Sequence, residues 1–143
     1  MLMLINLKER LNESEIQDIL SYSIFPDPER IEQTLHVYKS SEELELCGLE
    51  SEGEMVGVIG FRTDEADNLT LLHIAVKPEY RGAGFGRGLI LELIELKKPV
   101  KIIAETDEEA VDFYRAIGFE IESLGEKYPG VERFKCVYDV EEQ

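Results

Sequence analysis

The sequence predicts an α/β (α+β) fold, with a central mixed, mostly antiparallel sheet of about six to seven strands flanked by about four helices. Its 143 residues fit the usual size of one domain, and a 43% apolar composition suffices for one core around a sheet. Leu69 to Val76 is almost wholly apolar, as expected of a central strand that helices cover on both faces. This strand begins the first of two successive strand–helix units, which favour locally parallel strands. We therefore expect residues 1–143 to form a single domain.

The first expected elements are a short strand and two helices. Met1 to Leu7 has the apolar character of a strand, and Asn12 followed by Glu15 resembles a capping box that opens a helix. Three aliphatic residues would line one face of that helix: Ile16, Ile19 and Leu20. Asp27 before Pro28 predicts an N-cap with proline at the first helical position. The apolar residues of this second helix recur at helical spacing, at Ile31, Leu35 and Tyr38.

The central part of the chain predicts a hairpin, a strand and a third helix. Leu44 to Ser51 and Met55 to Arg62 are rich in aliphatic residues, and the Glu52-Gly53 turn signal separates them. The glycine-rich segment RGAGFGRG follows the strand at residues 69–76. Leucine and isoleucine then recur at helical spacing until Pro99 stops the helix.

The last part of the chain predicts a strand, a helix and a hairpin. Val100 to Ala104 is the strand, and Thr106 with Glu109 forms a capping-box pattern that opens a helix ending at Gly118. Two further strands close the chain as a hairpin, Phe119 to Gly125 and Phe134 to Val140. Between them, Lys127-Tyr128-Pro129-Gly130 has proline and glycine placed for a type II turn.

The charge balance is strongly acidic. Asp and Glu outnumber Lys and Arg by 31 to 15, which gives a formal charge of −16. Such a surface repels phosphate backbones and anionic lipids, so we expect neither nucleic acid nor membrane as a partner. It would attract a cationic amine, although a solvated acidic surface that favours solubility is the simpler explanation of the charge.

The cysteines and the N-terminal segment limit metal binding and export. Cys47 and Cys136 lie in strand-like runs without CxxC or Cys/His spacing, so we expect reduced, buried thiols and no metal site. The start, MLMLINLKER, opens with an unbroken run of only five apolar residues, too few for a signal-peptide core or a membrane span. We therefore expect a cytoplasmic protein.

The glycine-rich segment has the physical character of an anion site. Its four glycines are Gly82, Gly84, Gly86 and Gly88. Glycine lets the backbone approach a ligand, and the N-terminus of the following helix adds roughly half a positive charge. Lys77, Arg81 and Arg87 add local positive charge to an acidic protein. The dinucleotide pattern GxGxxG fails because Arg87 or Leu89 stands where it needs glycine, and no Gly-Lys-Ser/Thr triplet of a P-loop exists.

Two motifs resemble those of one enzyme family. Arg81-x-x-Gly84-x-Gly86 resembles the (Gln/Arg)-x-x-Gly-x-(Gly/Ala) signature of the GNAT superfamily of acetyl-CoA-dependent N-acetyltransferases. Downstream, the segment Asp107-x-x-Ala110-x-x-Phe113-Tyr114-x-x-x-Gly118-Phe119 is similar to the family's Asn-x-x-Ala-x-x-Phe-Tyr-x-x-x-Gly-Phe. The resemblance implies the acyl-CoA N-acyltransferase (GNAT) fold and acetyl-CoA as cofactor.

The same resemblance implies a cofactor site. The pyrophosphate would rest on backbone amides between Arg81 and Gly88, and the pantetheine arm would pair with the strand edge at Ile74 to Val76 as an added strand. Such pairing requires this strand and the Val100 to Ala104 strand to splay apart. The expected cofactor-binding residues are Ile74, Ala75, Val76, Arg81, Gly82, Ala83, Gly84, Phe85, Gly86, Arg87, Gly88, Asp107 and Tyr114. Asp107 departs from the family's asparagine, and an acid in the first turn of a helix is favourable without any ligand.

The resemblance also implies the catalytic groups. The family's equivalent of Tyr114 donates a proton to the departing thiolate; core packing of its ring is the alternative. An amine with a pKa near that of lysine needs roughly 4.6 kcal/mol to expose its lone pair at pH 7, so a base would help. Glu105 and His73 are the candidates, with Glu105 preferred. A solvated carboxylate at a strand end and a hydrogen-bonded histidine in a sheet are their respective alternatives.

The acceptor is a small-molecule or protein amine that the sequence does not identify, because acceptor pockets in such folds come from variable loops. Tyr128, Glu126 and Arg133 are candidates for lining its pocket, although turn and surface roles explain them equally well. A homodimer is the simplest expected assembly. The alternative function is a non-catalytic acyl-CoA-binding sensor or assembly module, and a purely structural role would leave the clustered glycines unexplained.

Overall fold

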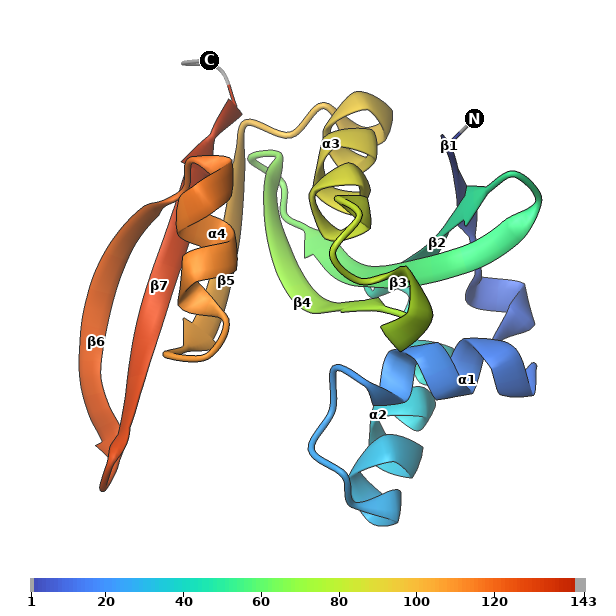
Figure 1. Ribbon diagram of the computed structural model, residues 1–143, viewed down its shortest axis with the longest axis horizontal. Helices are drawn as coiled ribbons and strands as arrows, with labels where there is room; N and C mark the ends of the chain where they lie inside the picture. The colour runs from blue at the N-terminus through green and yellow to red at the C-terminus, as the bar shows by residue number, and fades with distance from the viewer. Residues whose placement is uncertain (1, 141–143) are drawn as a thin grey trace. The chain divides into compact units, whose positions relative to one another are not determined.

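The computed structural model describes residues 2–140 and confirms the predicted fold class. Its seven strands form one mixed sheet in the order β1-β2-β3-β4-β5-β7-β6 (Figure 1). The strands are β1 (Leu2–Asn6), β2 (Glu45–Ser51), β3 (Glu54–Thr63), β4 (Asn68–Val76), β5 (Lys101–Asp107), β6 (Glu120–Tyr128) and β7 (Val131–Asp139). The helices in this part of the chain are α1 (Ser14–Ser21), α2 (Pro28–Ser40), α3 (Phe85–Lys97) and α4 (Val111–Ile117), with short 3-10 turns η1 (Lys8–Arg10) and η2 (Pro78–Tyr80).

The chain divides into two compact units. Unit 1 comprises Met1–Arg62 and Leu72–Lys97, and unit 2 comprises Thr63–Leu71 and Lys98–Gln143. The boundary therefore passes through β4. That residues 1–143 form a single domain stays a prediction. Within the described residues, no helix is both long and apolar enough to cross a membrane, and the cytoplasmic location also stays a prediction.

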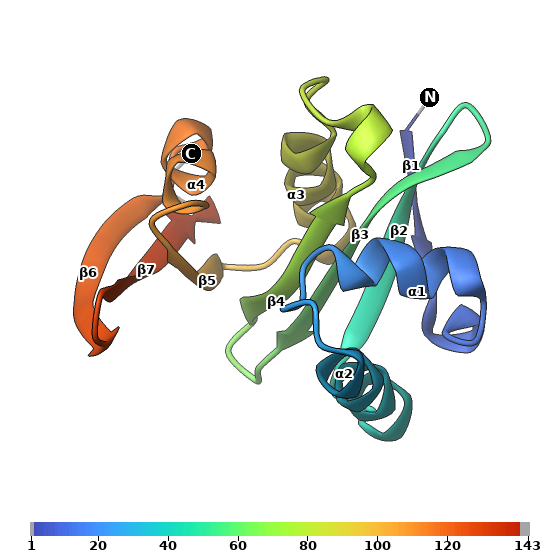
Figure 2. The same ribbon diagram turned by 60° about the horizontal axis from the view of Figure 1, so that its bottom comes forward.

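Unit 1 is a layered structure around strands β1 to β3. These strands pair antiparallel, and α1 and α2 lie on one face of them while α3 lies on the other (Figures 1 and 2). The face predicted for the first helix is confirmed, since all three of its aliphatic residues are buried: Ile16, Ile19 and Leu20. Leu35 and Tyr38 of α2 are buried in the same core. Burial of these apolar side chains stabilises the layer at about 25 cal/mol per Å² removed from water.

The two predicted starts of helices in unit 1 have different outcomes. Asp27 caps α2 as predicted, because its Oδ1 accepts from the amide of Glu29 at 3.1 Å. The capping box at Asn12 is wrong. Glu13 occupies the N-cap of α1 without a side-chain hydrogen bond, and Asn12 Oδ1 instead accepts from Lys39 Nζ at 2.7 Å.

Lys8 closes the C-terminal end of α2. Its ammonium donates to the carbonyls of Tyr38, Ser41 (2.8 Å) and Leu44 (2.6 Å). The last carbonyls of a helix have no partner within the helix, and a cation is favourable there. Lys8 thus supplies hydrogen bonds that the backbone of α2 lacks.

We expect Lys8→Met to lower the free energy of unfolding by about 1–3 kcal/mol, because methionine keeps the side-chain length but removes the donor from three carbonyls. Lys39→Met is the matched control, since among residues 2–140 the exposed Lys39 ammonium bonds to Asn12 alone and its loss should cost about 0.5 kcal/mol or less. Urea denaturation of both variants makes the comparison. Equal effects of the two substitutions would show that the bonds from Lys8 to these carbonyls do not stabilise the protein.

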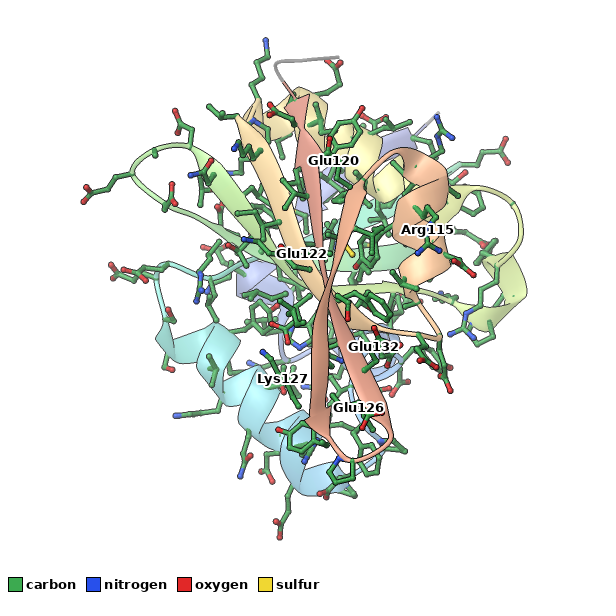
Figure 3. The ribbon with its side chains drawn as sticks, turned by 90° about the vertical axis from the view of Figure 1, so that its left-hand side faces the viewer. Arg115, Glu120, Glu122, Glu126, Lys127 and Glu132 are labelled. Atoms are coloured by element: carbon green, nitrogen blue, oxygen red, sulfur yellow. The ribbon has the colours of Figure 1, made fainter. Side chains whose placement is uncertain are left out.

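Unit 2 joins the start of β4 to the C-terminal strands. Asn68 to Thr70 pair in parallel with Lys101 to Ile103, which confirms the predicted parallel arrangement. β5 pairs antiparallel with β7, and β7 with β6. The hairpin of β6 and β7 is longer than predicted and strongly twisted, with Glu126 and Lys127 near its turn (Figure 3). Gly130 in that turn has φ +78°, as the predicted type II turn requires.

The capping box predicted at Thr106 is wrong. Thr106 is a buried residue of β5, which continues to Asp107. The helix α4 begins only at Val111, and the carboxylate of Asp107 caps the intervening turn by accepting from the amides of Glu109 (3.0 Å) and Ala110 (3.2 Å). The predicted end of the helix is confirmed, because Gly118 is its C-cap with φ +116°.

Candidate functional site

The glycine-rich loop in unit 1 combines two left-handed glycines with the start of a helix. Gly82 and Gly84 have φ +82° and +84°, a conformation that side chains with a Cβ rarely adopt. The Gly84 carbonyl accepts the first helical hydrogen bond of α3, from Gly88 N at 2.9 Å. The amides of Phe85, Gly86 and Arg87 precede that bond, so they lack partners within the helix. These amides and the positive end of the helix dipole suit an anion.

The segment that leads into this loop is fixed to β3. Lys77 N donates to Val56 O at 2.9 Å. Tyr80 donates a hydrogen bond to the carboxylate of Glu54, and its ring packs edge-on against Phe85 with centroids 5.9 Å apart. The loop is thus held at η2 on one side and by α3 on the other.

Two of the three predicted cations near the loop have partners of their own. Arg81 Nε donates to Val76 O at 3.0 Å, and its guanidinium lies 5.4 Å from the ring centroid of Tyr22. Lys77 Nζ lies 3.2 Å from a carboxylate oxygen of Glu15. The contacts of Arg81 hold its guanidinium between the end of β4 and Tyr22. Arg87 is exposed on the first turn of α3.

A hollow of about 310 Å³ lies beside Lys77 in unit 1. Carboxylates outnumber the single ammonium in its lining: Ser14, Glu15, Asp18, Ile19, Tyr22, Lys77 and Glu79. An excess of carboxylates favours a cation over an anion.

The end of β4 that belongs to unit 1 holds four of the predicted site residues. Ala75 is buried in the core, whereas His73, Ile74 and Val76 are half-buried. His73 Nδ1 lies 2.6 Å from the hydroxyl of Tyr38, and burial lowers the pKa of His73 below its usual value. His73 is therefore a neutral imidazole at pH 7, bonded through one nitrogen.

Tyr114 lies on α4 in unit 2 and is only 5% exposed. Its ring packs edge-on against Phe113 and Phe119, with centroids 5.1 and 5.2 Å apart. Within residues 2–140 its hydroxyl has no hydrogen-bond partner, and burial raises the pKa of Tyr114 to about 12. The phenol is therefore protonated at neutral pH, and its oxygen and proton are available to a ligand.

Glu105 is engaged in ion pairs on the exposed side of unit 2. One carboxylate oxygen lies 3.2 Å from Lys127 Nζ and 3.4 Å from Arg133 Nε. These cations, Lys127 first, lower the pKa of Glu105. A carboxylate with a lowered pKa is a weaker base, so these contacts argue for an anchoring role at the hairpin. The base assignment to Glu105 stays a prediction.

Asp107 uses one carboxylate oxygen for the turn before α4, as described above. This structural role is the alternative that the sequence offers for its departure from asparagine. A contact of Asp107 with the cofactor stays a prediction.

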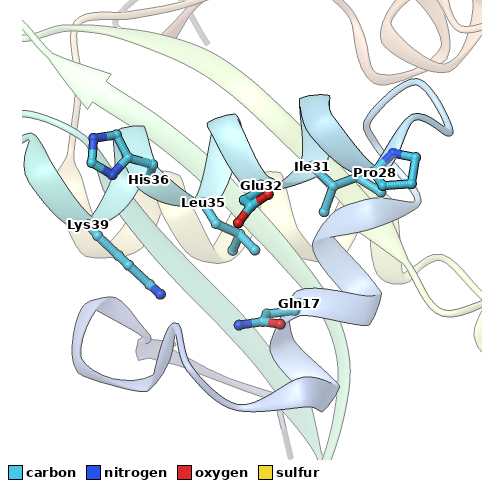
Figure 4. Close-up of a pocket in the computed structure, with 7 residues that line it drawn as sticks. All are labelled: Gln17, Pro28, Ile31, Glu32, Leu35, His36 and Lys39. Carbon is cyan, nitrogen blue, oxygen red and sulfur yellow. The ribbon is translucent and has the colours of Figure 1, made fainter.

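A larger groove of about 580 Å³ lies between α1 and α2 in unit 1 (Figure 4). Its lining mixes apolar and polar side chains: Gln17, Pro28, Ile31, Glu32, Leu35, His36 and Lys39. Two polar groups have protein partners, since Gln17 Nε2 donates to Leu11 O at 2.9 Å and Lys39 bonds to Asn12. None of the residues that the sequence predicts for the cofactor or for catalysis lines this groove.

Three residues near the site are not found from the sequence: Lys8, Tyr22 and Tyr38. Helical spacing marks Tyr38 as a core residue, and nothing local links it to His73. Tyr22 and Lys8 lie outside every periodic pattern. Their roles depend on where α1, α2 and η1 pack in unit 1, which spacing along the chain does not encode.

The remaining reactive or metal-binding groups to consider are the thiols and the acidic side chains. Cys47 and Cys136 are free and buried, as predicted, and burial raises the pKa of both thiols. Among the described residues, no cluster of three or more His, Cys, Asp or Glu side chains has the arrangement of a metal site.

The described geometry agrees with comparisons to known proteins. The chain is 33% identical over 81 residues to GCN5-related N-acetyltransferase 2, a chloroplastic protein of Arabidopsis thaliana, with 54% of this chain and 31% of that protein covered. It spans about a third of the length of the curated relatives that it matches first.

Solved structures show the same fold over nearly the whole chain. A protein of Desulfovibrio desulfuricans assigned to the GNAT family is 18% identical with a TM-score of 0.81, covering 98% of this chain and 99% of that one. A GNAT family acetyltransferase of Elizabethkingia anophelis with acetyl-CoA bound is 16% identical with a TM-score of 0.70, covering 96% and 97%. The family model of the acetyltransferase (GNAT) domain matches residues 42–121, which include the glycine-rich loop and Tyr114. Because that match spans more than half of the sequence, this chain belongs to the GNAT family of acetyltransferases.

Proposed function

We propose that this chain is an N-acetyltransferase that moves an acetyl group from acetyl-CoA to a primary amine in a ternary complex. The observation that carries the proposal is the loop from Gly82 to Gly88. Its two left-handed glycines and the free amides at the start of α3 suit a diphosphate such as that of coenzyme A. Membership of the GNAT family supplies the acyl thioester as the ligand to which that diphosphate belongs.

The residues of unit 1 would bind and orient the cofactor. The amides from Arg81 to Gly88 hold the diphosphate, and Arg81 and Arg87 place positive charge beside it. The backbone of Ile74 to Val76 pairs with the amide groups of the pantetheine arm as an added strand would. The half-buried side chains of Ile74 and Val76 exclude water from that backbone.

The chemistry requires an amine lone pair and a departing thiol. Acetyl-CoA supplies the thioester: the amine forms a bond to its carbonyl carbon, the carbon–sulfur bond breaks, and the thiolate takes a proton. Tyr114 donates that proton from its hydroxyl, which has no hydrogen-bond partner among residues 2–140 and whose pKa burial raises to about 12. The sequence also predicts that Asp107 contacts the cofactor and that Glu105 or His73 is the base. We keep these two assignments as predictions.

The acceptor we propose is a cationic amine, either a small molecule or a protein amine. The formal charge of −16 attracts cations over the whole surface, and the carboxylates of Glu15, Asp18 and Glu79 face the hollow beside Lys77. A homodimer stays the simplest expected assembly.

Calorimetric titration with acetyl-CoA and with free CoA tests the proposal directly. We expect dissociation constants in the micromolar range for both ligands, since both carry the diphosphate and the pantetheine arm. A thiol-release assay with a panel of amines then identifies the acceptor. If the protein binds neither ligand, the acetyltransferase assignment is wrong; if it binds both and releases no thiol with any amine, the protein is a binding module.

A further inference from the structure

Tyr38 and His73 form a polar pair within the core of unit 1. The hydroxyl of Tyr38 on α2 lies 2.6 Å from His73 Nδ1 on β4, and the two rings are tilted by 57° with centroids 5.5 Å apart. Tyr38 is 1% exposed, whereas His73 is half-buried. The pair therefore connects a side chain buried in the core with a partly exposed side chain on β4.

The surroundings of Tyr38 fix its position from both ends. A Cβ atom at Gly60 would overlap the Tyr38 hydroxyl, so the phenol occupies space that only glycine leaves on β3. The ammonium of Lys8 bonds to the main-chain carbonyl of the same tyrosine. The phenol therefore lies directly against the backbone of β3, and the main chain of Tyr38 is bonded to Lys8.

The pair determines which nitrogen of His73 carries the proton. A neutral imidazole has one nitrogen that accepts and one that donates, and the hydrogen bond at one nitrogen selects the role of the other. The phenol has a proton to give, burial keeps it neutral by raising the pKa of Tyr38, and it has no other partner within residues 2–140. A hydrogen bond from Tyr38 to Nδ1 leaves the proton of His73 on Nε2.

We infer that Tyr38 is a positioning residue that holds His73 as a neutral Nε2–H donor for the acyl oxygen of acetyl-CoA, in place of the base that the sequence suggests. The part that concerns acetyl-CoA rests on the proposed function. His73 directly precedes the strand residues proposed to pair with pantetheine, Ile74 to Val76. An N–H group cannot bind an ammonium or an amine hydrogen, whereas the thioester oxygen is an acceptor present in every turnover. A hydrogen bond to that oxygen would favour attack on the carbonyl carbon.

Nitrogen-15 NMR of the free protein tests the tautomer. The chain has two histidines, and His36 is exposed on α2, so His36→Gln assigns the spectrum without touching the pair. We expect a protonated Nε2 and an unprotonated Nδ1 for His73 at pH 7. In Tyr38→Phe, which keeps the ring and removes the hydroxyl, Nδ1 should shift toward the average of two exchanging tautomers. A protonated Nδ1 in the wild-type protein would overturn the inference.

Calorimetric titration tests the inferred contact between His73 and the acyl oxygen of acetyl-CoA. His73→Leu removes the donor, while His73→Gln places an amide N–H near the position of Nε2. We expect His73→Leu to bind acetyl-CoA about two- to tenfold more weakly while CoA affinity stays within twofold, and His73→Gln to restore most of the loss. Each variant is compared only if its melting temperature lies within a few degrees of that of the wild-type protein.

Unchanged acetyl-CoA affinity in His73→Leu overturns the donor role, as does equal weakening for acetyl-CoA and CoA. If the wild-type protein binds neither ligand, the proposed function and the acyl contact fall together. The NMR result still decides separately whether Tyr38 fixes the tautomer, so the two failures are distinguishable.

Discussion

Replacing Gly84 with aspartate should weaken acetyl-CoA binding at least about 100-fold, which corresponds to roughly 2.7 kcal/mol. Aspartate tolerates the left-handed backbone better than most residues, and a Cβ at Gly84 meets no atom within 4 Å, so the fold should survive. The new carboxylate would stand beside the amides proposed to hold the diphosphate and repel it. Calorimetric titration with acetyl-CoA measures the loss.

Gly53→Asp provides the matched control. Gly53 has φ +85°, and a Cβ there also meets nothing within 4 Å, but the residue lies in the turn between β2 and β3. Both variants therefore carry the same backbone strain and the same added charge. Equal affinities of Gly84→Asp and Gly53→Asp would show that the loop does not bind the diphosphate.

Tyr114→Phe should lower kcat about 100-fold while acetyl-CoA affinity stays within about threefold, because proton donation by a positioned side chain contributes at least that much. The ring contacts to Phe113 and Phe119 survive in phenylalanine. Since the hydroxyl has no partner within the described residues, its removal should change the free energy of unfolding by about 0.5 kcal/mol or less. Steady-state thiol release with the identified amine measures the rate.

The pH dependence gives a second test of the same role. The wild-type rate should rise with pH as the amine loses its proton, and Tyr114, with its pKa raised to about 12, should cause no decline below that pH.

Tyr138→Phe is the control for Tyr114→Phe, since this tyrosine also packs on Phe119, with centroids 5.3 Å apart. If Tyr138→Phe lowers kcat as much as Tyr114→Phe, the effect belongs to the aromatic cluster and not to the proton donor.

Periodic patterns predict the elements of this fold and fail at some of their ends. The apolar run at residues 69–76 and the glycine loop after it lie where the sequence places them, because a largely shielded strand and left-handed turns restrict the residue types that fit. Thr106 shows the failure. A threonine before acidic residues suits either a helix cap or the end of a strand, and only the pairing of β5 with β7 decides for the strand.

The site is predictable to the extent that it is local. The loop from Gly82 to Gly88 is one continuous segment with its own backbone requirements, so its motif reveals it. The pair of Tyr38 and His73 joins residues 35 positions apart, and its formation depends on where α2 packs against the sheet of unit 1. The ion pair between Glu105 and Lys127 is also non-local. It forms because the hairpin of β6 and β7 continues beyond the apolar residues of the hairpin and brings Lys127 to Glu105.

The division of the chain within β4 has a consequence for the order of folding during synthesis. Unit 1 is complete in sequence once Lys97 has been made, since its segments end at Arg62 and Lys97. The segment from Thr63 to Leu71 is translated earlier, yet its parallel partner in β5 begins only at Lys101. On the ribosome, the parallel pairing of β4 with β5 can therefore form only after the whole sequence of unit 1 has been made.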